Sequence, residues 1–583
     1  MEPANPQLAA IFQEMADVTE ILGGDRFRVN SFAKVARLLG DMTEDVAEIG
    51  PDEKKLMALD GIGKGTAGRI VQFLRTGKIQ DHVDLLAKVP EGLLVLLEIP
   101  GLGPKTVALL WKQGGVESLD DLKTKLEGDE LAQLPGLGAK KLQNLRDAIA
   151  FTAASGDRIR IGQAMPLAKW FVDQMRGLKG VEHAEYAGSL RRGQETIGDI
   201  DIIVAADAKR AKAISDAFAS LQPVEQVLAK GRTKTSVRVR LDGEHSVQVD
   251  LRVVEPGSYG AAMMYFTGSK QHNVTMRQRA LKAGMTLNEY RLAKDDQLVA
   301  ADTEQNVFKA MGLAWIPPEL REDRGEIALA EKGKLPQLVT IDDIAAELHT
   351  HTTASDGHWS IRELAIACAE RGFHTVAVTD HSKGQIQANG LSAQRLEAQI
   401  AEVRKVAAEL AGTITILAGS EVDILADGRL DYPNSLLKEL DVVVAAPHAA
   451  LSQEPAKATA RLLKAIEHPY VHILSHPTGR LINRRPGLSP DIKALCKAAA
   501  EHHVAMEVNA NHYRLDLRDT HIRVALDAGA KISINTDAHG PADLDELRYG
   551  VLTARRAGAT KKDVVNCLSQ AAMAKWLRQS RQR

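Results

Sequence analysis

The stretch GSLRRGQETIGDID, Gly188–Asp201, places two arginines a few residues ahead of two aspartates that are separated by one residue. The second aspartate lies within the apolar run IDIIVA, which is typical of a buried β-strand. Residues i and i+2 of a strand point to the same side, so we expect Asp199 and Asp201 to face the same way. Two carboxylates this close repel each other unless a cation lies between them. The stretch therefore predicts a cation site on a strand beside a basic loop.

A third carboxylate fits the same site. Asp250 lies in SVQVDLRVV, 246–254, which is another alternating apolar run. If the two strands are neighbours, three carboxylates converge and suit two Mg²⁺ or Mn²⁺ ions, the arrangement that drives in-line displacement at phosphorus. Ser189 and Arg192, with nearby backbone N–H groups, can then hold a triphosphate. The alternative is that Arg191 and Arg192 pair with the aspartates and that no metal binds.

Composition sets the frame for these motifs. The 583 residues predict several domains, and 44% hydrophobic with 26% charged residues is an ordinary globular balance. Net charge is only −2, yet residues 151–300 carry 22 Lys and Arg against 17 Asp and Glu, so this stretch can bind phosphates. Three cysteines without CxxC spacing, no signal-peptide pattern and no apolar run of about 20 residues predict a cytoplasmic protein without a membrane partner. No coiled-coil pattern occurs, so we expect a monomer.

One pattern recurs three times in the helical region 1–150. It consists of an apolar residue, a Gly-x-Gly turn and an amphipathic helix, in LDGIGKGTAGRI (59–70), IPGLGPKTVALL (99–110) and LPGLGAKKLQNL (134–145). The glycines permit a tight turn with close backbone approach, and the following helix N-terminus presents N–H groups to an anion. The pattern resembles the helix-hairpin-helix, which grips the nucleic-acid backbone without reading sequence. The expected DNA-binding glycines are Gly61, Gly63, Gly101, Gly103, Gly136 and Gly138.

Histidines are concentrated in the C-terminal part of the chain, since 14 of the 18 follow residue 338. In this region seven apolar runs alternate with helix-like stretches, which predicts a parallel sheet and a barrel related to the eight-unit type. Most of the runs end in a His, Asp or Glu, and barrels place their active sites at the C-terminal ends of strands. Such a ring can hold more than one divalent ion, such as Zn²⁺ or Mn²⁺. The alternative for single histidines is ordinary core packing.

These motifs resemble two known families. The constellation G-S…D-x-D with a later Asp is similar to the nucleotidyltransferases, and GSLRRGQETIGDID, YFTGSKQHN (265–273) and NVTMRQRALKAGMTLNEY (273–290) resemble the family X DNA polymerases. The resemblance implies that Asp199, Asp201 and Asp250 bind the catalytic metals. The residues implied to bind the nucleotide are Gly188, Ser189, Arg192, Gly198, Tyr265, Phe266, Gly268 and Asn273. Tyr265 and Phe266 would lie under the incoming sugar, and Arg277 would support the template side.

The strand-end residues after 338 resemble the polymerase and histidinol phosphatase (PHP) domain. The family carries nine ligands around a three-metal centre that hydrolyses phosphoesters. The matching residues are His349, His351, Asp356, His381, Glu421, His448, His476, Asp537 and His539. The family often has His at the position of Asp356, so one metal is expected to differ in character.

Together these resemblances predict a multidomain α/β protein. We expect a helical DNA-binding domain (1–95) with the first hairpin motif, fingers (96–155) with two more, and a nucleotidyltransferase palm (156–262). A small α/β thumb (263–318), a charged, proline-containing linker (319–338) and a (β/α)7-type PHP barrel (339–583) follow.

Two departures from the polymerase family limit what can be carried over. The lysine that forms a Schiff base with an abasic sugar is matched by Arg69, which stays protonated and cannot act as that nucleophile. Lys64 is nearby but has no strong claim to the role. Lys270 replaces an acidic residue, so stacking on the incoming base would differ.

The predicted function is a template-directed DNA polymerase that fills short gaps in base-excision repair. Its partners are gapped or primed duplex DNA and dNTPs, and its PHP domain supplies a 3′–5′ exonuclease, abasic-site endonuclease or 3′-end-cleaning activity. Three alternatives remain. They are a template-independent nucleotidyltransferase, a DNA-binding scaffold with a structural PHP domain, and a small-molecule phosphatase with a vestigial polymerase.

Overall fold

The computed structural model describes residues 4–41, 46–59, 62–97, 99, 102–128, 130–138, 141–143, 145, 146, 149, 158–241 and 246–580. The chain divides into two compact units. The first contains residues 1–156 with 483–485, and the second contains residues 157–482 with 486–583. No helix of the described residues is long and apolar enough to cross a membrane. All three cysteines are free thiols, and Cys368 and Cys496 are buried.

The first unit is helical, as expected. Helices α1 (Ala4–Leu22) and α2 (Arg26–Asp41) pack together through Phe12 and Phe32, whose ring centroids lie 6.2 Å apart. One apolar core runs through the unit. The remaining helices are α3 (Val46–Ile49), α4 (Glu53–Leu56), α5 (Lys64–Thr76), α6 (Gln80–Leu86), α7 (Gly92–Leu97), α8 (Pro104–Gly114) and α9 (Leu119–Glu127), with the 3₁₀-helix η1 (Glu130–Gln133).

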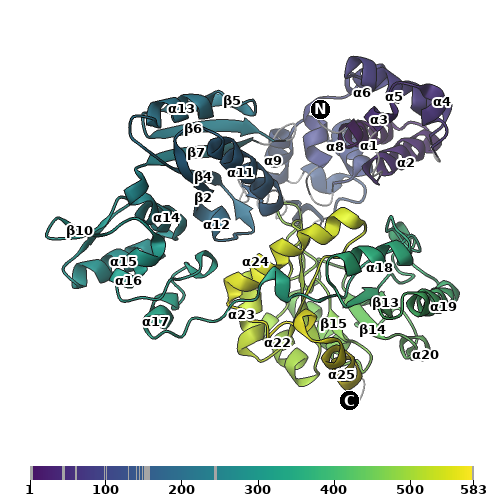
Figure 1. Ribbon diagram of the computed structural model, residues 1–583. Helices are drawn as coiled ribbons and strands as arrows, with labels where there is room; N and C mark the ends of the chain where they lie inside the picture. The colour runs from purple at the N-terminus through teal and green to yellow at the C-terminus, as the bar shows by residue number, and fades with distance from the viewer. Residues whose placement is uncertain are drawn as a thin grey trace. The chain divides into compact units, whose positions relative to one another are not determined.

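The palm is a five-stranded sheet in the order β2-β4-β7-β6-β5. Its strands are β2 (Val181–Tyr186), β4 (Asp199–Ala206), β5 (Val224–Lys230), β6 (Lys234–Arg240) and β7 (Ser246–Val254). Helices α11 (Ile161–Arg176) and α13 (Ala211–Ala219) share an apolar core with alternate residues of β4 and β7. The short helix α12 (Gly188–Arg191) and the two-stranded pair of β1 (Ile159–Arg160) and β3 (Thr196–Ile197) precede β4. Figure 1 shows the sheet with α11 and α13 beside it.

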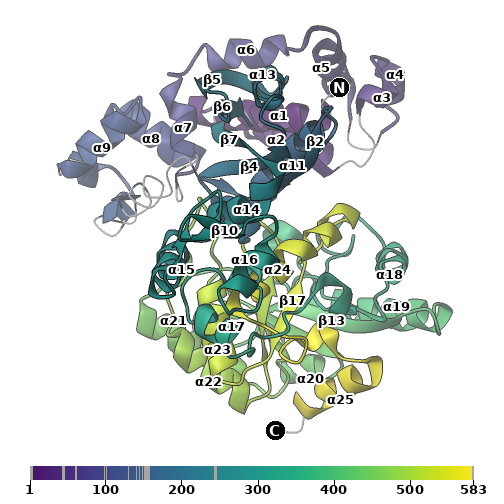
Figure 2. The same ribbon diagram turned by 60° about the vertical axis from the view of Figure 1, so that its left-hand side comes forward.

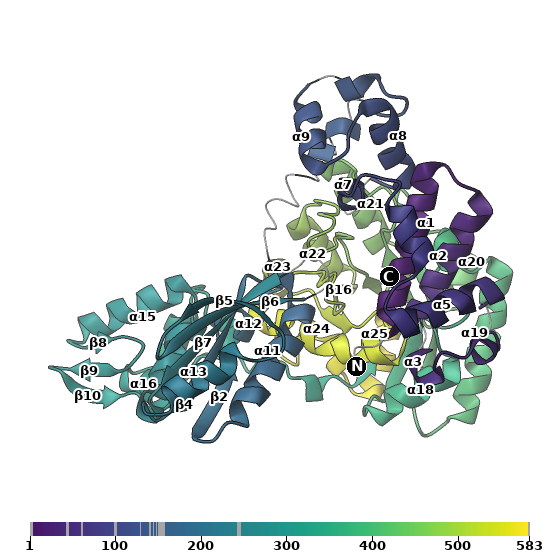
Figure 3. The same cartoon turned by 90° about the horizontal axis from the view of Figure 1, so that it is seen from above.

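The thumb combines three helices with a small antiparallel sheet, as expected. The helices are α14 (Tyr259–Thr267), α15 (Lys270–Lys282) and α16 (Glu304–Ala310). The strands β8 (Thr286–Leu287), β9 (Leu292–Lys294) and β10 (Gln297–Ala300) lie together beside α15 and α16 in Figure 3. Met276, Phe308 and Leu313 lie in the core of this domain.

The segment 319–338, which we expected to be a linker, is instead folded onto the thumb. It contains the end of η3 (Pro318–Leu320) and helix α17 (Glu326–Glu331), and Leu320 and Ile327 belong to the thumb core. Arg321 is fully buried and pairs with Glu304 at 2.6 Å. Three of the charges that suggested a solvated linker, Glu319, Arg321 and Glu326, are therefore buried ion-pair partners.

The barrel contains seven parallel strands in sequence order, which confirms the predicted (β/α)7 architecture. The strands are β11 (Ala346–Glu347), β12 (Thr375–Val378), β13 (Thr415–Asp423), β14 (Val442–Ala446), β15 (Ile473–Leu474), β16 (Ala505–Asn509) and β17 (Ile532–Asn535). A bridge between Thr350 and Ala538 joins the first and last strand regions. The long covering helices are α18 (Ile361–Glu370), α19 (Ala393–Glu409), α21 (Pro455–Ile466), α22 (Ile492–Glu501), α23 (Asp519–Asp527), α24 (Leu547–Ala557) and α25 (Gln570–Ser580). Figure 2 shows α21, α22 and α23 in a row outside the strands.

Candidate active sites of the palm and the barrel

The three palm aspartates lie on one face of two neighbouring strands. β4 and β7 are parallel and paired, with Asp201 directly opposite Asp250. Ile200 and Ile202 point into the core shared with α11 and α13, so Asp199 and Asp201 point to the opposite face. Asp199 is exposed, Asp201 is half-buried and Asp250 is buried. The sheet therefore presents a cluster of carboxylates at graded depth.

This cluster holds more negative charge than its protein partners balance. Burial, then the charges of Asp199 and Asp250, raise the pKa of Asp201 to about 7. Asp250 accepts a hydrogen bond from Gln248 Nε2 at 2.9 Å and pairs with Lys234 Nζ at 3.3 Å. A raised carboxyl pKa means that the ionised form is destabilised, and a divalent cation between the oxygens removes that penalty. Hard oxygen ligands of this kind fit Mg²⁺ or Mn²⁺.

The loop before β4 approaches the carboxylates closely. Gly188 has φ +62°, and a Cβ there would clash with Asp201 Oδ2. The residue is therefore glycine for two reasons, its backbone conformation and the space that Asp201 needs. Ser189 is half-buried in the same turn, and a Cβ at Gly198 would lie 3.0 Å from Arg158 Nη1.

The two arginines of the loop pair with the thumb. Arg191 donates to both carboxylate oxygens of Glu304 at 2.9 and 2.8 Å. Arg192 donates to Glu322 Oε1 at 2.9 Å and to the carbonyl oxygen of Thr267 at 2.8 Å. Within the described residues, neither arginine forms an ion pair with an aspartate of the palm. The alternative in which the arginines neutralise the aspartates is therefore wrong.

The aromatic motif of the thumb lies within a hydrogen-bonded group. Tyr265 and Phe266 are edge to face, and Arg277 Nη2 donates to the Tyr265 hydroxyl at 2.9 Å. Asn273 Nδ2 donates to the carbonyl oxygen of Tyr265 at 2.6 Å, and a Cβ at Gly268 would lie 2.5 Å from Asn273 Oδ1. Arg252, two residues after Asp250 on β7, covers the Phe266 ring at 4.2 Å. The motif is thus connected to the strand that carries Asp250. Lys270 is exposed at the start of α15.

The hairpin glycines of the first unit lie at helix starts. Gly63 and Gly103 cap the N-termini of α5 and α8 in extended conformations, and a Cβ at either would meet nothing within 4 Å. Gly136 has φ +76°, while Gly138 accepts backbone hydrogen bonds from Lys141 and Leu142. Gly61 and Gly101 lie outside the described residues.

Arg69 lies at the position of the expected lyase lysine, and its side chain contacts other residues of the helical unit. Its Nε donates to Asp81 Oδ2 at 2.9 Å, its Nη1 donates to the carbonyl oxygen of Gly65, and its guanidinium lies over Phe32. The side chain therefore supports the packing of the helical unit. Lys64 begins α5.

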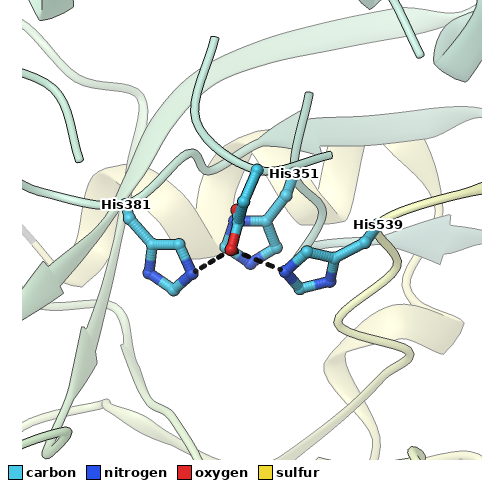
Figure 4. Close-up of side chains that lie close together, drawn as sticks. His351, His381 and His539 are labelled. Carbon is cyan, nitrogen blue, oxygen red and sulfur yellow. Dashed lines mark ion pairs between the residues drawn. The ribbon is translucent and has the colours of Figure 1, made fainter. Parts of the chain in front are cut away.

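The barrel brings the nine expected metal ligands together. Glu421, from the end of β13, is central and lies 3.4 Å from His349 Nε2, 2.8 Å from His381 Nδ1, 3.2 Å from His448 Nε2 and 2.9 Å from His476 Nε2. Asp537 lies 2.9 Å from His351 Nε2. His381 and His539 flank His351, and Asp356 lies 3.5 and 3.4 Å from their Nε2 atoms (Figure 4).

These side chains suit divalent metals. Among the described residues, Nε2 of His349, Nδ1 of His351, Nδ1 of His476 and Oε2 of Glu421 are buried without a hydrogen-bond partner. Burial, then the neighbouring His539 and His381, lower the pKa of His351 to about 4, so its imidazole is held neutral, the form that binds metal. Three groups of ligand atoms lie close enough to hold an ion each: His351, Asp356, His381 and His539; His349, His351 and Glu421; and His381, Glu421 and His448. Mixed nitrogen and oxygen donors fit Zn²⁺ or Mn²⁺.

Three residues that sequence reasoning missed surround this centre. Glu507 on β16 binds His349 Nδ1 at 2.7 Å, and Asp423 binds His448 Nδ1 at 2.6 Å. Such partners fix the ring orientation of a ligand histidine. Arg514 Nε lies 3.7 Å from Asp537 Oδ2 and brings a positive charge to the centre. The buried acid in the apolar run AMEVN was a usable signal for Glu507.

Models of known families match segments of the N-terminal half and of the C-terminal barrel. The sequence matches a helix-hairpin-helix domain over 3–79 and a SAM-like helix-hairpin-helix tandem over 93–150. It matches the DNA polymerase beta thumb over 262–322 and the PHP domain over 347–511.

Individual relatives cover either the whole chain or one of its halves. The DNA polymerase/3′-5′ exonuclease PolX of Bacillus subtilis is 36% identical over 561 residues, 96% of each chain. DNA polymerase lambda of Rattus norvegicus is 25% identical over 51% of this chain and 53% of its own length. A probable phosphatase of Thermoanaerobacter is 27% identical over 38% of this chain and 90% of its own length. The chain therefore belongs to the family X DNA polymerases that carry a C-terminal PHP domain.

Proposed function

We propose that this protein is a template-directed DNA polymerase that fills short gaps, joined to a 3′–5′ exonuclease in its PHP barrel. The observation that carries the proposal is the convergence of Asp199, Asp201 and Asp250 on one face of the palm, beside the loop of Ser189 and Arg192. A scaffold or a small-molecule phosphatase has no use for this cluster.

The polymerase reaction forms a bond from the primer 3′-oxygen to the α-phosphorus of a dNTP and breaks the bond to pyrophosphate, which leaves. Asp199 and Asp201 hold both divalent ions, and Asp250 holds one and assists deprotonation of the 3′-OH. Divalent ions held by these aspartates would supply positive charge for the triphosphate and acidify the primer hydroxyl. Ser189 and Arg192 hold the triphosphate, with Gly188 and Gly198 giving the backbone room to approach.

The thumb motif selects the incoming nucleotide. Tyr265 and Phe266 lie under the sugar and exclude ribonucleotides, and their hydrogen bonds and ring contacts with Arg277, Asn273 and Arg252 fix their orientation. Asn273 contacts the base in the minor groove, and Arg277 supports the template side of the new pair.

The barrel hydrolyses phosphodiester bonds at the primer end. Its nine ligands would hold up to three Zn²⁺ or Mn²⁺ ions, and these would supply a Lewis acid for water and for the scissile phosphate. Glu507 and Asp423 keep two of the imidazoles in orientation. The same centre also suits abasic-site cleavage or cleaning of blocked 3′-ends, which would complete a role in base-excision repair.

The hairpin motifs supply grip on DNA. The N-terminal ends of α5 and α8 bind phosphates of the gapped duplex through backbone N–H groups. The protein therefore acts on nucleoid DNA. It acts as a monomer. Arg69 forms an ion pair with Asp81, and we propose no lyase activity for this residue.

The test uses a one-nucleotide gapped duplex with a labelled primer and a downstream 5′-phosphate. With Mg²⁺ or Mn²⁺, the wild-type protein is expected to extend the primer by one nucleotide when the templated dNTP is present and to shorten it when dNTP is absent. Asp199→Ala is expected to abolish extension by at least about a hundredfold while shortening continues, because it removes a metal ligand of the palm only. His349→Ala is expected to abolish shortening only.

The two variants act as controls for each other, since each leaves the other site intact. Failure of the wild-type protein to extend any primer would refute the polymerase assignment. Extension that ignores the template base would instead favour the template-independent nucleotidyltransferase. Loss of both activities in His349→Ala would contradict the assignment of separate sites.

A further inference from the structure

The palm and the barrel share an interface that is packed like a protein core. Leu515 and Tyr549 of the barrel are fully or almost fully buried in the same apolar cluster as the palm strands β4 and β7. A Cβ at Gly162 of the palm would clash with the ring of His512. Gly193, in the loop after α12, has φ +68°, and a Cβ there would lie 3.3 Å from Leu552 Cβ of α24. The loop that carries Ser189 and Arg192 thus rests directly on the barrel.

A buried ion pair fixes the second half of that loop. Glu195 lies between Arg192 and Asp199, and both of its carboxylate oxygens accept hydrogen bonds from Arg480 of the barrel, at 3.0 and 2.6 Å. Arg518 lies 3.7 Å away on the same carboxylate. The Arg480 side chain is only 5% exposed, and a bidentate pair of this kind defines position as well as charge. The backbone of Glu195 also accepts a hydrogen bond from Ile161, which ties the loop to β1 and α11.

A second barrel arginine reaches the first half of the loop. Arg556 of α24 donates from Nη1 to the carbonyl oxygen of Arg192 at 2.7 Å and to Glu322 Oε1 at 2.9 Å. Its Nη2 donates to Asp519 at 2.9 Å, and the side chain is 3% exposed. Glu322 Oε1 is the same oxygen that holds Arg192 Nε, so one thumb carboxylate is shared by a loop arginine and a barrel arginine. Figures 1 and 3 show α24 next to α12.

We propose that Arg480 and Arg556 of the PHP barrel are positioning residues of the polymerase, which hold the loop Gly188–Asp199 in the form that receives the dNTP triphosphate. When Arg192 leaves Glu322 for a phosphate, Arg556 remains to pair with Glu322, so no buried carboxylate is left uncompensated. The barrel is then a structural part of the nucleotide site as well as a nuclease. This inference rests on the proposed polymerase function.

The experiment measures single-nucleotide gap filling by the full-length protein with Arg556→Ala, Arg480→Ala and Arg404→Ala. Arg404 is the control, because its bidentate pair with Asp441 joins two residues of the barrel domain at its surface. We expect KM for the templated dNTP to rise about tenfold or more in the first two variants, with kcat within about threefold, since a misplaced loop weakens triphosphate binding before it affects chemistry. Arg404→Ala should match the wild type, and primer shortening by Arg556→Ala should stay within about twofold and report a folded barrel.

A double-mutant cycle tests whether Arg480 acts through Glu195. In the Glu195→Gln background, Arg480→Ala should add little to KM, because the pair is already broken. Equal KM in wild type, Arg556→Ala and Arg480→Ala, with normal melting temperatures, would overturn the inference while leaving the polymerase in place. An equal rise of KM in Arg404→Ala would also overturn it, because the effect would then be unspecific. A wild-type protein that incorporates no dNTP would remove both the proposed function and this inference.

Discussion

At the scale of single residues, Glu507 occupies a site where both of its oxygens are used. Oε1 contacts His349 Nδ1 at 2.7 Å and accepts from Asn535 at 2.9 Å, while Oε2 accepts from Ser475 and from the backbone N–H of His476. It therefore orients one ligand imidazole and the backbone of another. A fully buried carboxylate with four partners is a precise support for metal ligands.

Glu507→Gln is expected to weaken metal binding by the barrel about 10- to 100-fold, because the neutral amide no longer raises the basicity of His349. Metal content measured after dialysis against chelators of rising strength tests this, together with primer shortening. The control is Glu347→Gln, another buried acid of the barrel, which bonds to Thr536 and to backbone N–H groups including that of His349 but, among the described residues, to no imidazole. Equal metal retention in both variants would contradict the role of Glu507.

A carboxylate within an apolar strand was the signal that identified the palm site from sequence. Asp201 and Asp250 are acids inside apolar strands, and such acids are costly unless a cation or a hydrogen-bond network compensates them. Glu507 in AMEVN carries the same signal inside its strand, whereas most of the barrel ligands that the sequence indicates follow their strands. Arg514 carries no such signal, because it lies outside the barrel strands and spacing does not define its contact with Asp537. Asp423 ends β13, but its contact with His448 depends on the path of the loop after β14.

At the scale of elements, the hairpin turns separate two reasons for a glycine. Gly136, with φ +76°, needs glycine for its own backbone. Gly63 and Gly103 adopt extended conformations, and a Cβ added at either position would meet nothing within 4 Å, so the folded protein tolerates a side chain there. Glycine is also preferred over valine at a helix N-cap, and close approach of an external partner, such as a DNA backbone, is a second reason for glycine at those two turns.

The double variant Gly63→Val and Gly103→Val is expected to stay folded, with a melting temperature lowered by roughly 4–8 °C through two weaker N-caps, and to lose affinity for gapped DNA. Loss of two hydrogen bonds to phosphate, at about 1.5 kcal/mol each, corresponds to roughly a hundredfold weaker binding. Fluorescence anisotropy with labelled gapped duplex measures it. Gly257→Val serves as control, because its Cβ also meets nothing within 4 Å and it lies in the palm. Unchanged DNA affinity in the double variant would show that these turns do not contact DNA.

Regular elements were predictable where one period dominates. The seven apolar runs after residue 338 correspond to β11–β17, because strands buried on both faces read as continuous apolar runs. The segment 319–338 was misjudged for the opposite reason. Its charged residues Glu319, Arg321 and Glu326 are buried. Their ion-pair partners are Arg555, Glu304 and His272, which lie outside the segment. The composition of the segment alone therefore predicts a solvent-exposed linker.

At the scale of the whole second unit, the sequence pattern distinguishes palm from barrel but does not predict the contact between them. Ile482, Leu515 and Tyr549 belong to the core of a sheet that ends near residue 254, and nothing in their local sequence distinguishes them from barrel residues. Contacts between residues so far apart in the chain follow from tertiary packing only. The consequence is thermodynamic, because two domains with one core unfold together more readily than two domains joined by a polar surface.

Tyr549→Ala tests this coupling. Tyr549 lies in α24 and is 2% exposed within the palm cluster, so truncation of its ring should cost about 3–5 kcal/mol. Hydrogen–deuterium exchange should then accelerate by about a hundredfold in β4 and β7 as well as in α24, because the shared core opens as one unit. Leu462→Ala is the control, since Leu462 is buried in the barrel cluster that contains no palm residue. It should accelerate exchange in the barrel while β4 and β7 keep their protection, and faster exchange confined to α24 in Tyr549→Ala would show that the palm is stable without the barrel.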